Sequence, residues 1–126
     1  MLKPPEAGEQ DMTKIETSHG AGGKIMQRLL EEVIIPSFSR RHAGDIGLDE
    51  MDDGATLKAD GKELVVCTDA HTIQPLFFPG GDIGKLTACG TINDVAVMGA
   101  KPIAMTNTII VEEGFEIATL KTILES

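Results

Sequence analysis

The longest apolar run of the chain lies between Pro79 and Pro102 and has the pattern of a single helix. Asp82 is placed to cap its N-terminus, and Gly99, followed by Pro102, is placed to end it after Met98. The residues between these signals leave almost no polar face, which is typical of a helix surrounded by protein. The pattern therefore predicts a buried helix that begins after Asp82 and runs to Met98.

Asn93 and Asp94 are the polar exception inside this predicted helix. An isolated carboxylate in apolar surroundings costs several kcal/mol unless a cation or hydrogen-bond donors compensate it. Lys85 is too far along the helix to pair with Asp94, because it lies more than two turns away. Asp94 therefore needs a partner from elsewhere. A bound metal, a cationic ligand group, a backbone amide and an arginine are the alternatives.

A glycine-rich stretch, Thr17–Lys24, leads into a second apolar periodicity that predicts a helix ending at Pro36. Its apolar face would consist of Ile25, Met26, Leu29, Leu30 and Val33. A glycine-rich loop that enters a helix can present backbone amides to a phosphate, although its glycines can equally serve only to turn the chain. It is not a Walker loop, because the spacing before Lys24 is too short and Ile25 replaces the required Ser or Thr.

The segments 55–59 and 62–68 flank Asp60-Gly61, a strong signal for a two-residue hairpin turn. In that register Asp52 faces Asp69, and Asp53 faces Thr68, with facing Cβ atoms about 5 Å apart. The carboxylates gathered there repel each other unless a cation lies between them, and hard oxygen ligands of this kind suit Mg²⁺ shared with phosphates. A bulge at Gly54 would exchange Asp52 and Asp53 as the inward residue, and ordinary solvated acidic side chains are the alternative.

The remaining segments have weaker patterns. Residues 37–50 have no period and predict a surface connection, and 71–79 is extended because Pro75 and Pro79 oppose a helix. His71, two residues after Asp69, could touch a ligand or be a surface residue. Residues 103–111 predict a strand, 112–114 a turn, and the helical spacing after it continues to Ser126 without a stop signal. We therefore expect the chain to be the front piece of a longer protein.

The composition narrows the class of partner. Twenty acidic and eleven basic residues give a net charge of -9, which argues against nucleic acid or an anionic membrane surface. Cys67 and Cys89 lie in apolar runs and predict buried thiols in a reducing cytoplasm rather than a disulfide. Residues 1–14 read as a flexible polar tail without the apolar core of a signal peptide, and no run is long enough to cross a membrane.

Four features occur in a fixed order: the glycine-rich loop, Asp52-Asp53-Gly54-Ala55, the strand ending Cys67-Thr68-Asp69, and the helix carrying Gly90-Thr91-Ile92-Asn93-Asp94. Together they resemble the N-terminal domain of the aminoimidazole ribonucleotide synthetase-like (PurM-like) ATP-binding superfamily. Residues 18–24 and 74–85 look most like the HypE group of hydrogenase maturation proteins. The match covers nearly the whole chain from Ile15 onward, which gives residues 15–126 as one ATP-binding domain.

The resemblance implies an α+β domain with a mixed β-sheet and helices packed on one face. Two copies would pair their sheets into a β-barrel, giving a homodimer. It implies ATP and Mg²⁺ as cofactors, with Mg²⁺ on Asp53, Asp69 and Asp94. The residues implied to bind the cofactors are His19, Gly20, Gly22, Gly23, Lys24, Asp53, Asp69, Lys85, Asn93 and Asp94.

For this group the resemblance implies that ATP drives dehydration of a carbamoyl group, carried on a C-terminal cysteine, to a thiocyanate that supplies cyanide to the iron of nickel-iron hydrogenase. Its implied partners are a carbamoyltransferase and an iron-binding scaffold protein. This chain lacks the second domain and the terminal cysteine, so we expect it to fold and dimerise without catalysis. Alternatives are a thiamine monophosphate kinase or selenophosphate synthetase type of enzyme, or a non-catalytic docking module. Selenophosphate synthetase usually has a reactive residue in the glycine-rich loop, where this chain has Ser18-His19.

Overall fold

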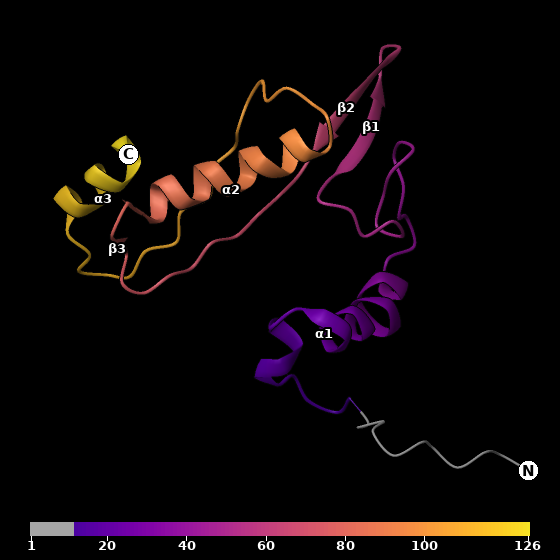
Figure 1. Ribbon diagram of the computed structural model, residues 1–126, viewed down its shortest axis with the longest axis horizontal. Helices are drawn as coiled ribbons and strands as arrows, with labels where there is room; N and C mark the ends of the chain where they lie inside the picture. The colour runs from indigo at the N-terminus through magenta and orange to yellow at the C-terminus, as the bar shows by residue number, and fades with distance from the viewer. Residues whose placement is uncertain (1–11) are drawn as a thin grey trace, which may run out of the picture. The chain divides into compact units, whose positions relative to one another are not determined.

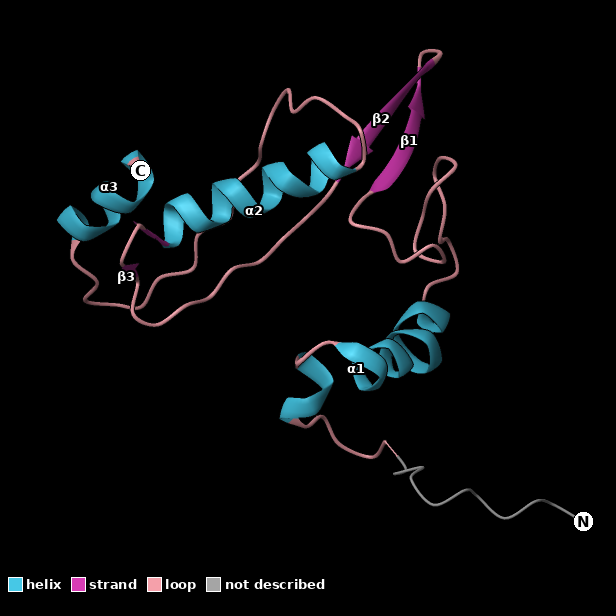
Figure 2. Ribbon diagram, viewed as in Figure 1, coloured by secondary structure: helices cyan, strands magenta, loops and turns pink. Residues whose placement is uncertain are grey.

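A computed structural model describes residues 12–126, which divide into two units, one ending at Ser39 and the other comprising Arg40–Ser126 (Figure 1). Helices and short strands occur together, so the predicted α+β class is confirmed (Figure 2). Of the predicted tail, residues 1–14, all but the last three lie outside the described residues.

The first unit is a run of helical turns. A 3₁₀ turn, Thr17–Gly20, precedes α1 (Gly23–Leu29), which continues as a π-helical turn, Leu30–Ile34, and a last 3₁₀ turn, Ile35–Ser37. The predicted helix is present, but it begins inside the glycine-rich stretch, and Pro36 lies within its final turn rather than after it. Ile35 is the one hydrophobic side chain that is buried within residues 12–126. Much of the predicted apolar face, including Ile25 and Val33, is therefore exposed.

The predicted hairpin is confirmed in the second unit. β1 (Ala55–Ala59) pairs antiparallel with β2 (Lys62–Val66), and Ala55 lies opposite Val66, which is the predicted register. Asp60 and Gly61 have φ angles of 48° and 72°, as the turn between such strands requires. β2 ends two residues earlier than expected, so Asp52, Asp53 and Asp69 lie in the loops beyond the ladder rather than as facing pairs.

The predicted central helix is present as α2 (Ile83–Val97), with Asp82 as its N-cap. The Asp82 Oδ1 atom accepts hydrogen bonds from the backbone N–H groups of Gly84 (2.8 Å) and Lys85 (3.1 Å). The short strands β3 (Phe77–Phe78) and β4 (Gly81–Asp82) pair just before it. The expected burial is wrong: none of the α2 side chains is buried, although many are half-buried, and α3 and β4 are the elements that pack against the helix most.

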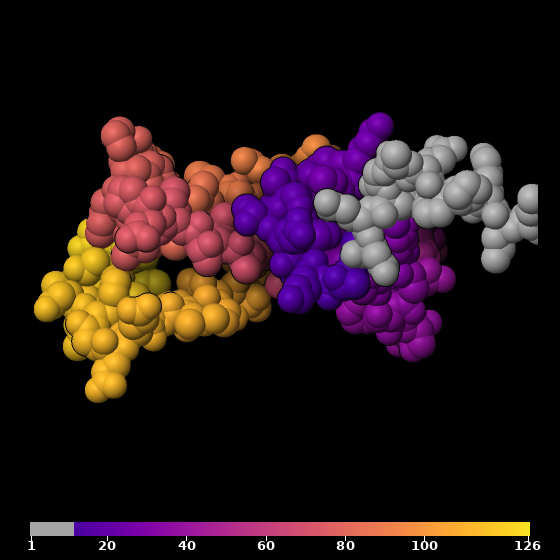
Figure 3. All heavy atoms as spheres, turned by 90° about the horizontal axis from the view of Figure 1, so that it is seen from below, coloured from indigo at the N-terminus to yellow at the C-terminus, as the bar shows by residue number. Residues whose placement is uncertain are grey.

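The predicted strand at Ile103–Val111 is also wrong. Within residues 12–126 this segment forms no strand, and Ile103 and Ile110 are 85% and 94% exposed. In the space-filling view the orange-to-yellow chain that leads to the C-terminal helix lies open at the surface (Figure 3). A strand needs a neighbour for its backbone groups, and apolar β-formers alone do not supply one. The turn at Glu112–Phe115 and the helix after it, α3 (Ile117–Glu125), are as predicted.

The sheet differs from the expectation of one mixed sheet covered by helices. The described residues form two separate two-stranded antiparallel sheets, β1-β2 and β3-β4. The parallel pairing within residues 12–126 is an isolated bridge between Ala43 and Leu57, and it does not join the two sheets. No helix in residues 12–126 has both the length and the apolar character needed to span a bilayer.

Candidate functional site

Three carboxylates come together in the second unit, and we call Asp53, Asp69 and Asp94 the carboxylate cluster. Asp53 lies just before β1, Asp69 follows β2, and Asp94 lies near the C-terminal end of α2. Burial raises the pKa of Asp94, and the charge and a side-chain hydrogen bond of Asp69 and the charge of Asp53 raise it further, while His71 lowers it. These influences require the three carboxylates to be neighbours.

The structure identifies charged groups that lie next to Asp94, which the sequence left open. The charged groups that act on Asp94 are the two aspartates and His71. Asp94 takes part in no ion pair with a lysine or arginine within the part of the chain that the structure describes. Asp53, not Asp52, acts on Asp94, while Asp52 Oδ1 accepts a hydrogen bond from the Asp53 N–H (3.1 Å). Asp94 is half-buried rather than buried, so water can compensate part of its charge, and a bound cation remains one of the alternatives.

Cys67 ties the end of β2 to α2. Its Sγ donates to the carbonyl oxygen of Thr91 at 3.5 Å. Burial raises the pKa of the Cys67 thiol, and the charges of Asp69 and Asp94 raise it further, so the reactive thiolate form is disfavoured and the thiol reacts slowly. Both cysteines are free thiols. Cys67 is half-buried, but the expected burial of Cys89 is wrong, because that residue is exposed on α2.

The donor chemistry of the cluster suits a hard cation. Within residues 12–126 no three His, Cys, Asp or Glu side chains are arranged to hold one metal ion by themselves. Mg²⁺ rarely uses an all-protein cage, and is usually bound through one or two carboxylates together with phosphate oxygens and water. Asp94, whose pKa is raised by burial and by the charges of Asp69 and Asp53 and which pairs with no lysine or arginine among the described residues, fits that mode of binding.

The other predicted site residues are spread over both units. Lys85 and Asn93 are exposed on α2, and Lys85 Nζ donates to the carbonyl oxygen of Gly80 at 3.3 Å, away from Asp94. His19 is buried, and its Nδ1 atom accepts from the Glu16 N–H at 2.9 Å. The remaining residues of the glycine-rich loop are all exposed in the first unit: Gly20, Gly22, Gly23 and Lys24.

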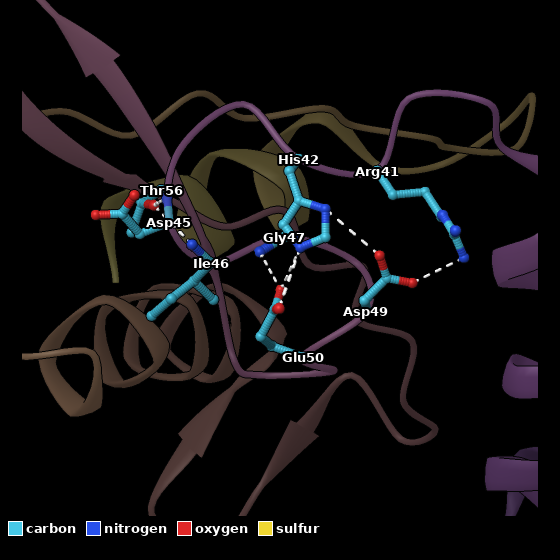
Figure 4. Close-up of polar contacts among 8 residues, drawn as sticks. All are labelled: Arg41, His42, Asp45, Ile46, Gly47, Asp49, Glu50 and Thr56. Carbon is cyan, nitrogen blue, oxygen red and sulfur yellow. Dashed lines mark hydrogen bonds and ion pairs between the residues drawn. The ribbon is translucent and has the colours of Figure 1, made fainter.

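A second polar cluster was not predicted, and we call residues 41–50 the polar loop (Figure 4). Arg41 pairs with Asp49 at 2.8 Å, and His42 Nδ1 lies 3.4 Å from the same carboxylate. His42 Nε2 lies 2.8 Å from Glu50 Oε2, which also accepts from the Gly47 N–H at 2.7 Å. The sequence signal was present as basic residues followed by acidic ones, but without a period it indicated only a surface connection.

The polar loop is anchored to β1 through a buried threonine. Thr56 is 5% exposed, and its Oγ1 atom accepts from the N–H groups of Asp45 (2.8 Å) and Ile46 (3.0 Å). The Gly47 N–H and His42 hold the pKa of Glu50 below its usual value. Every acidic side chain of the loop has a partner, with Asp45 bound to Lys58, so this cluster is explained by structure alone.

Residues 51–126 match the family described as AIR synthase related protein, N-terminal domain. A protein of Methanocaldococcus jannaschii, named for hydrogenase expression and formation, is 49% identical over 114 residues, which is 90% of this chain and 34% of that protein. A protein named carbamoyl dehydratase HypE from Cupriavidus necator is 44% identical, over 90% of this chain and 31% of that protein. A protein of the same name from Escherichia coli is 43% identical, over 91% of this chain and 34% of that protein. The chain thus spans about a third of the length of these relatives.

Proposed function

Because the chain belongs to the AIR synthase related protein family, as its N-terminal domain, we propose that it is the ATP- and Mg²⁺-binding part of a HypE-like hydrogenase maturation protein. The full protein would be a carbamoyl dehydratase that uses ATP to convert a carbamoylated C-terminal cysteine to a thiocyanate, the source of cyanide ligands. The names of the relatives support this activity. Because those relatives are about three times as long, we expect no turnover from these 126 residues alone.

The observation that carries the proposal is the position of Asp94 beside two other carboxylates. Burial and the charges of Asp69 and Asp53 raise the pKa of Asp94, so a divalent cation that binds there would stabilise its ionised form. Bound Mg²⁺ would supply charge neutralisation for a transferring phosphoryl group. The protein's part is to keep at least two carboxylates ionised and aimed at one place, with phosphate oxygens completing the coordination.

Each unit, taken by itself, offers further residues that we propose for contacts with the nucleotide. The loop residues proposed for this role are His19, Gly20, Gly22, Gly23 and Lys24, of which all except His19 are exposed. The buried His19 accepts the Glu16 N–H and so holds the turn that presents the loop. From α2 the exposed side chains of Lys85 and Asn93 would contribute a cation and an amide.

We further propose a homodimer formed through this domain, with the strands of two copies completing a β-barrel. The apolar segment Ile103–Val111 supports this arrangement, since within the described residues it pairs with no strand and its Ile103 and Ile110 side chains are largely exposed. The carbamoyltransferase and the iron-binding scaffold protein would be the partners of the complete enzyme in the cytoplasm.

The test compares Mg²⁺-ATP binding by the wild-type chain and by Asp94→Asn with isothermal titration calorimetry. We expect the substitution to weaken binding by a factor of about ten or more, which corresponds to about 1.4 kcal/mol. Asp60→Asn is the matched control, because it removes the same charge at the exposed hairpin turn. Equal binding by the wild type and Asp94→Asn would refute the proposal.

A docking module without nucleotide binding is the second candidate, and the exposure of Ile103 and Ile110 favours it. In that case Asp94→Asn would leave dimerisation unchanged and the wild-type chain would not bind Mg²⁺-ATP. Sedimentation of both proteins alongside the calorimetry separates the two candidates. An enzyme of the small-molecule kinase type would bind Mg²⁺-ATP in the same way and would differ in the acceptor of the phosphoryl group.

A further inference from the structure

The segment that follows β2 runs along α2 in the opposite direction, from the C-terminal end of the helix toward its N-terminal end (Figure 1). Alternate residues of this segment meet the helix. Cys67 Sγ reaches the Thr91 carbonyl, and Asp69 lies close enough to Asp94 for its charge to act on it. His71 lies against Gly90. Residues two apart on an extended chain point to the same side, so one face of the segment is applied to the helix.

The spacings of the two elements match. Two residues of extended chain advance by about 6.6 Å, and four residues of helix advance by about 6 Å. The step from Asp69 to His71 is therefore close to the step from Asp94 back to Gly90, although Cys67, which reaches Thr91, does not continue it. With the ring of His71 over Gly90, Asp69 lies near Asp94, and a shift of the segment along the helix would separate the two carboxylates.

The contact between His71 and Gly90 leaves no room for a side chain on the helix. A methyl group at Gly90 would lie 2.6 Å from His71 Nε2 and 3.1 Å from Cε1, both well inside van der Waals contact. The Nδ1 atom of His71 is buried and has no hydrogen-bond partner among residues 12–126. The His71 ring is therefore held on this side by packing against the α2 backbone at Gly90, and not by a hydrogen bond at Nδ1.

We propose that His71 and Gly90 are positioning residues, whose contact fixes the segment 67–71 along α2 and so sets the separation of Asp69 and Asp94. Neither residue needs to touch the ligand. The effect of the His71–Gly90 contact on Mg²⁺-ATP binding rests on the proposed function, whereas its effect on the packing of the segment does not. The two consequences are therefore measured separately.

The first measurement follows the packing through Cys67, which lies on the same face of the segment. In a Cys89→Ala background Cys67 is the one remaining thiol, and its rate of reaction with dithiobis(nitrobenzoate) reports how closely the segment lies on α2. We expect Gly90→Ala to raise this rate about tenfold, because the added methyl group pushes the segment from the helix. In His71→Ala/Gly90→Ala the methyl group has space, so the rate should be no faster than in His71→Ala alone.

Gly84→Ala is the matched control on the same helix. A methyl group there would overlap the Ile123 carbonyl of α3, so it disturbs α2 equally closely but away from the segment, and it should leave the Cys67 rate unchanged. An unchanged rate in Gly90→Ala, or additive effects of the two substitutions, would overturn the proposal. If Gly90→Ala does not fold by circular dichroism, His71→Ala, which adds no atoms, should by itself accelerate the thiol reaction, and no acceleration would overturn it.

The second measurement is Mg²⁺-ATP titration of the same variants. We expect Gly90→Ala to bind about tenfold more weakly than the wild type, and the double variant to bind like His71→Ala. If the wild-type chain does not bind Mg²⁺-ATP, the proposed function fails while the thiol rates still decide the positioning role. If the rates change as expected and the affinity does not, the contact positions the segment without positioning the cofactor, and that result overturns the link to the site.

Discussion

The two acidic regions of the second unit, the polar loop and the carboxylate cluster, differ in how their charges are compensated. In the polar loop Asp49 faces Arg41 and His42, and Glu50 faces His42 and a backbone N–H. In the carboxylate cluster the carboxylates face each other. The pKa of Glu50 is lowered by its partners, and that of Asp94 is raised by burial and by like charges. The charges of the polar loop are neutralised by partners within the protein. The charges of the carboxylate cluster are not, so the cluster can still attract a cationic ligand.

The largest effect is expected from overfilling the polar loop with Gly47→Ala. Gly47 is buried, and a methyl group there would overlap the Arg41 carbonyl oxygen and lie 2.7 Å from the His42 ring. We expect the free energy of unfolding to fall by about 2–3 kcal/mol. Urea unfolding followed by circular dichroism measures it. Gly20→Ala is the control, because nothing lies within 4 Å of the added methyl group. Equal stabilities of the two variants would mean that the loop is not closely packed.

A somewhat smaller effect is expected from Thr56→Val. The substitution keeps the shape of this buried side chain and removes the Oγ1 acceptor of the Asp45 and Ile46 N–H groups. Leaving these donors without a partner should cost about 2 kcal/mol in unfolding free energy. Thr122→Val on α3 is the control, since that hydroxyl is exposed and bonds only to the preceding turn. A loss no greater than that of the control would refute the anchoring role.

The cluster should respond to acid in the direction opposite to the loop, and Asp94→Asn tests this. The folded-state pKa of Asp94 lies above its usual value of 3.8. Its favourable contribution to stability is therefore fully present below pH 3.8 and is lost as pH rises through the folded pKa. At pH 7 we expect Asp94→Asn to be more stable than the wild type, with the difference disappearing in acid. Unfolding free energies measured between pH 3 and 7, in the absence of Mg²⁺, would contradict this if the variant were less stable at neutral pH.

The smallest effect is expected from Glu50→Gln in the polar loop. The folded-state pKa of Glu50 lies below its usual value of 4.5, so its contribution to stability is present above pH 4.5 and is lost as pH falls through the folded pKa. The variant should be less stable than the wild type at pH 7 and indistinguishable from it in strong acid. The same acid series measures this difference. If both variants changed in the same direction at pH 7, the contrast between the two regions would be wrong.

The local elements could be predicted from the sequence, because their signals lie in neighbouring residues. Asp60-Gly61 determines the hairpin register, and Asp82 caps α2 through amides two and three residues away. Burial could not be predicted in the same way. Residues 103–111 and α2 have the composition of buried elements, but what covers them depends on chain that the apolar pattern does not identify.

The candidate site also has one part that could be predicted from the sequence and one part that could not. The hairpin register predicted that Asp52, Asp53 and Asp69 lie close together, and the set Asp53, Asp69 and Asp94 was implied only by the family resemblance. The contact between His71 and Gly90 was not predicted, since it depends on how an irregular segment lies on a helix face. The polar loop was missed for the same reason: its ion pairs form between residues that share no secondary structure.

The N-cap residue of α2, Asp82, is also hydrogen-bonded to Ser126, which follows α3. Ser126 Oγ donates to Asp82 Oδ1 at 2.8 Å, on the same oxygen that accepts from Gly84 and Lys85. Opening of α3 therefore removes a partner from the first turn of α2. In hydrogen-exchange terms, the Gly84 and Lys85 amides should share one opening event with the amides of α3, so that their exchange rates rise together when Ser126 is replaced by alanine.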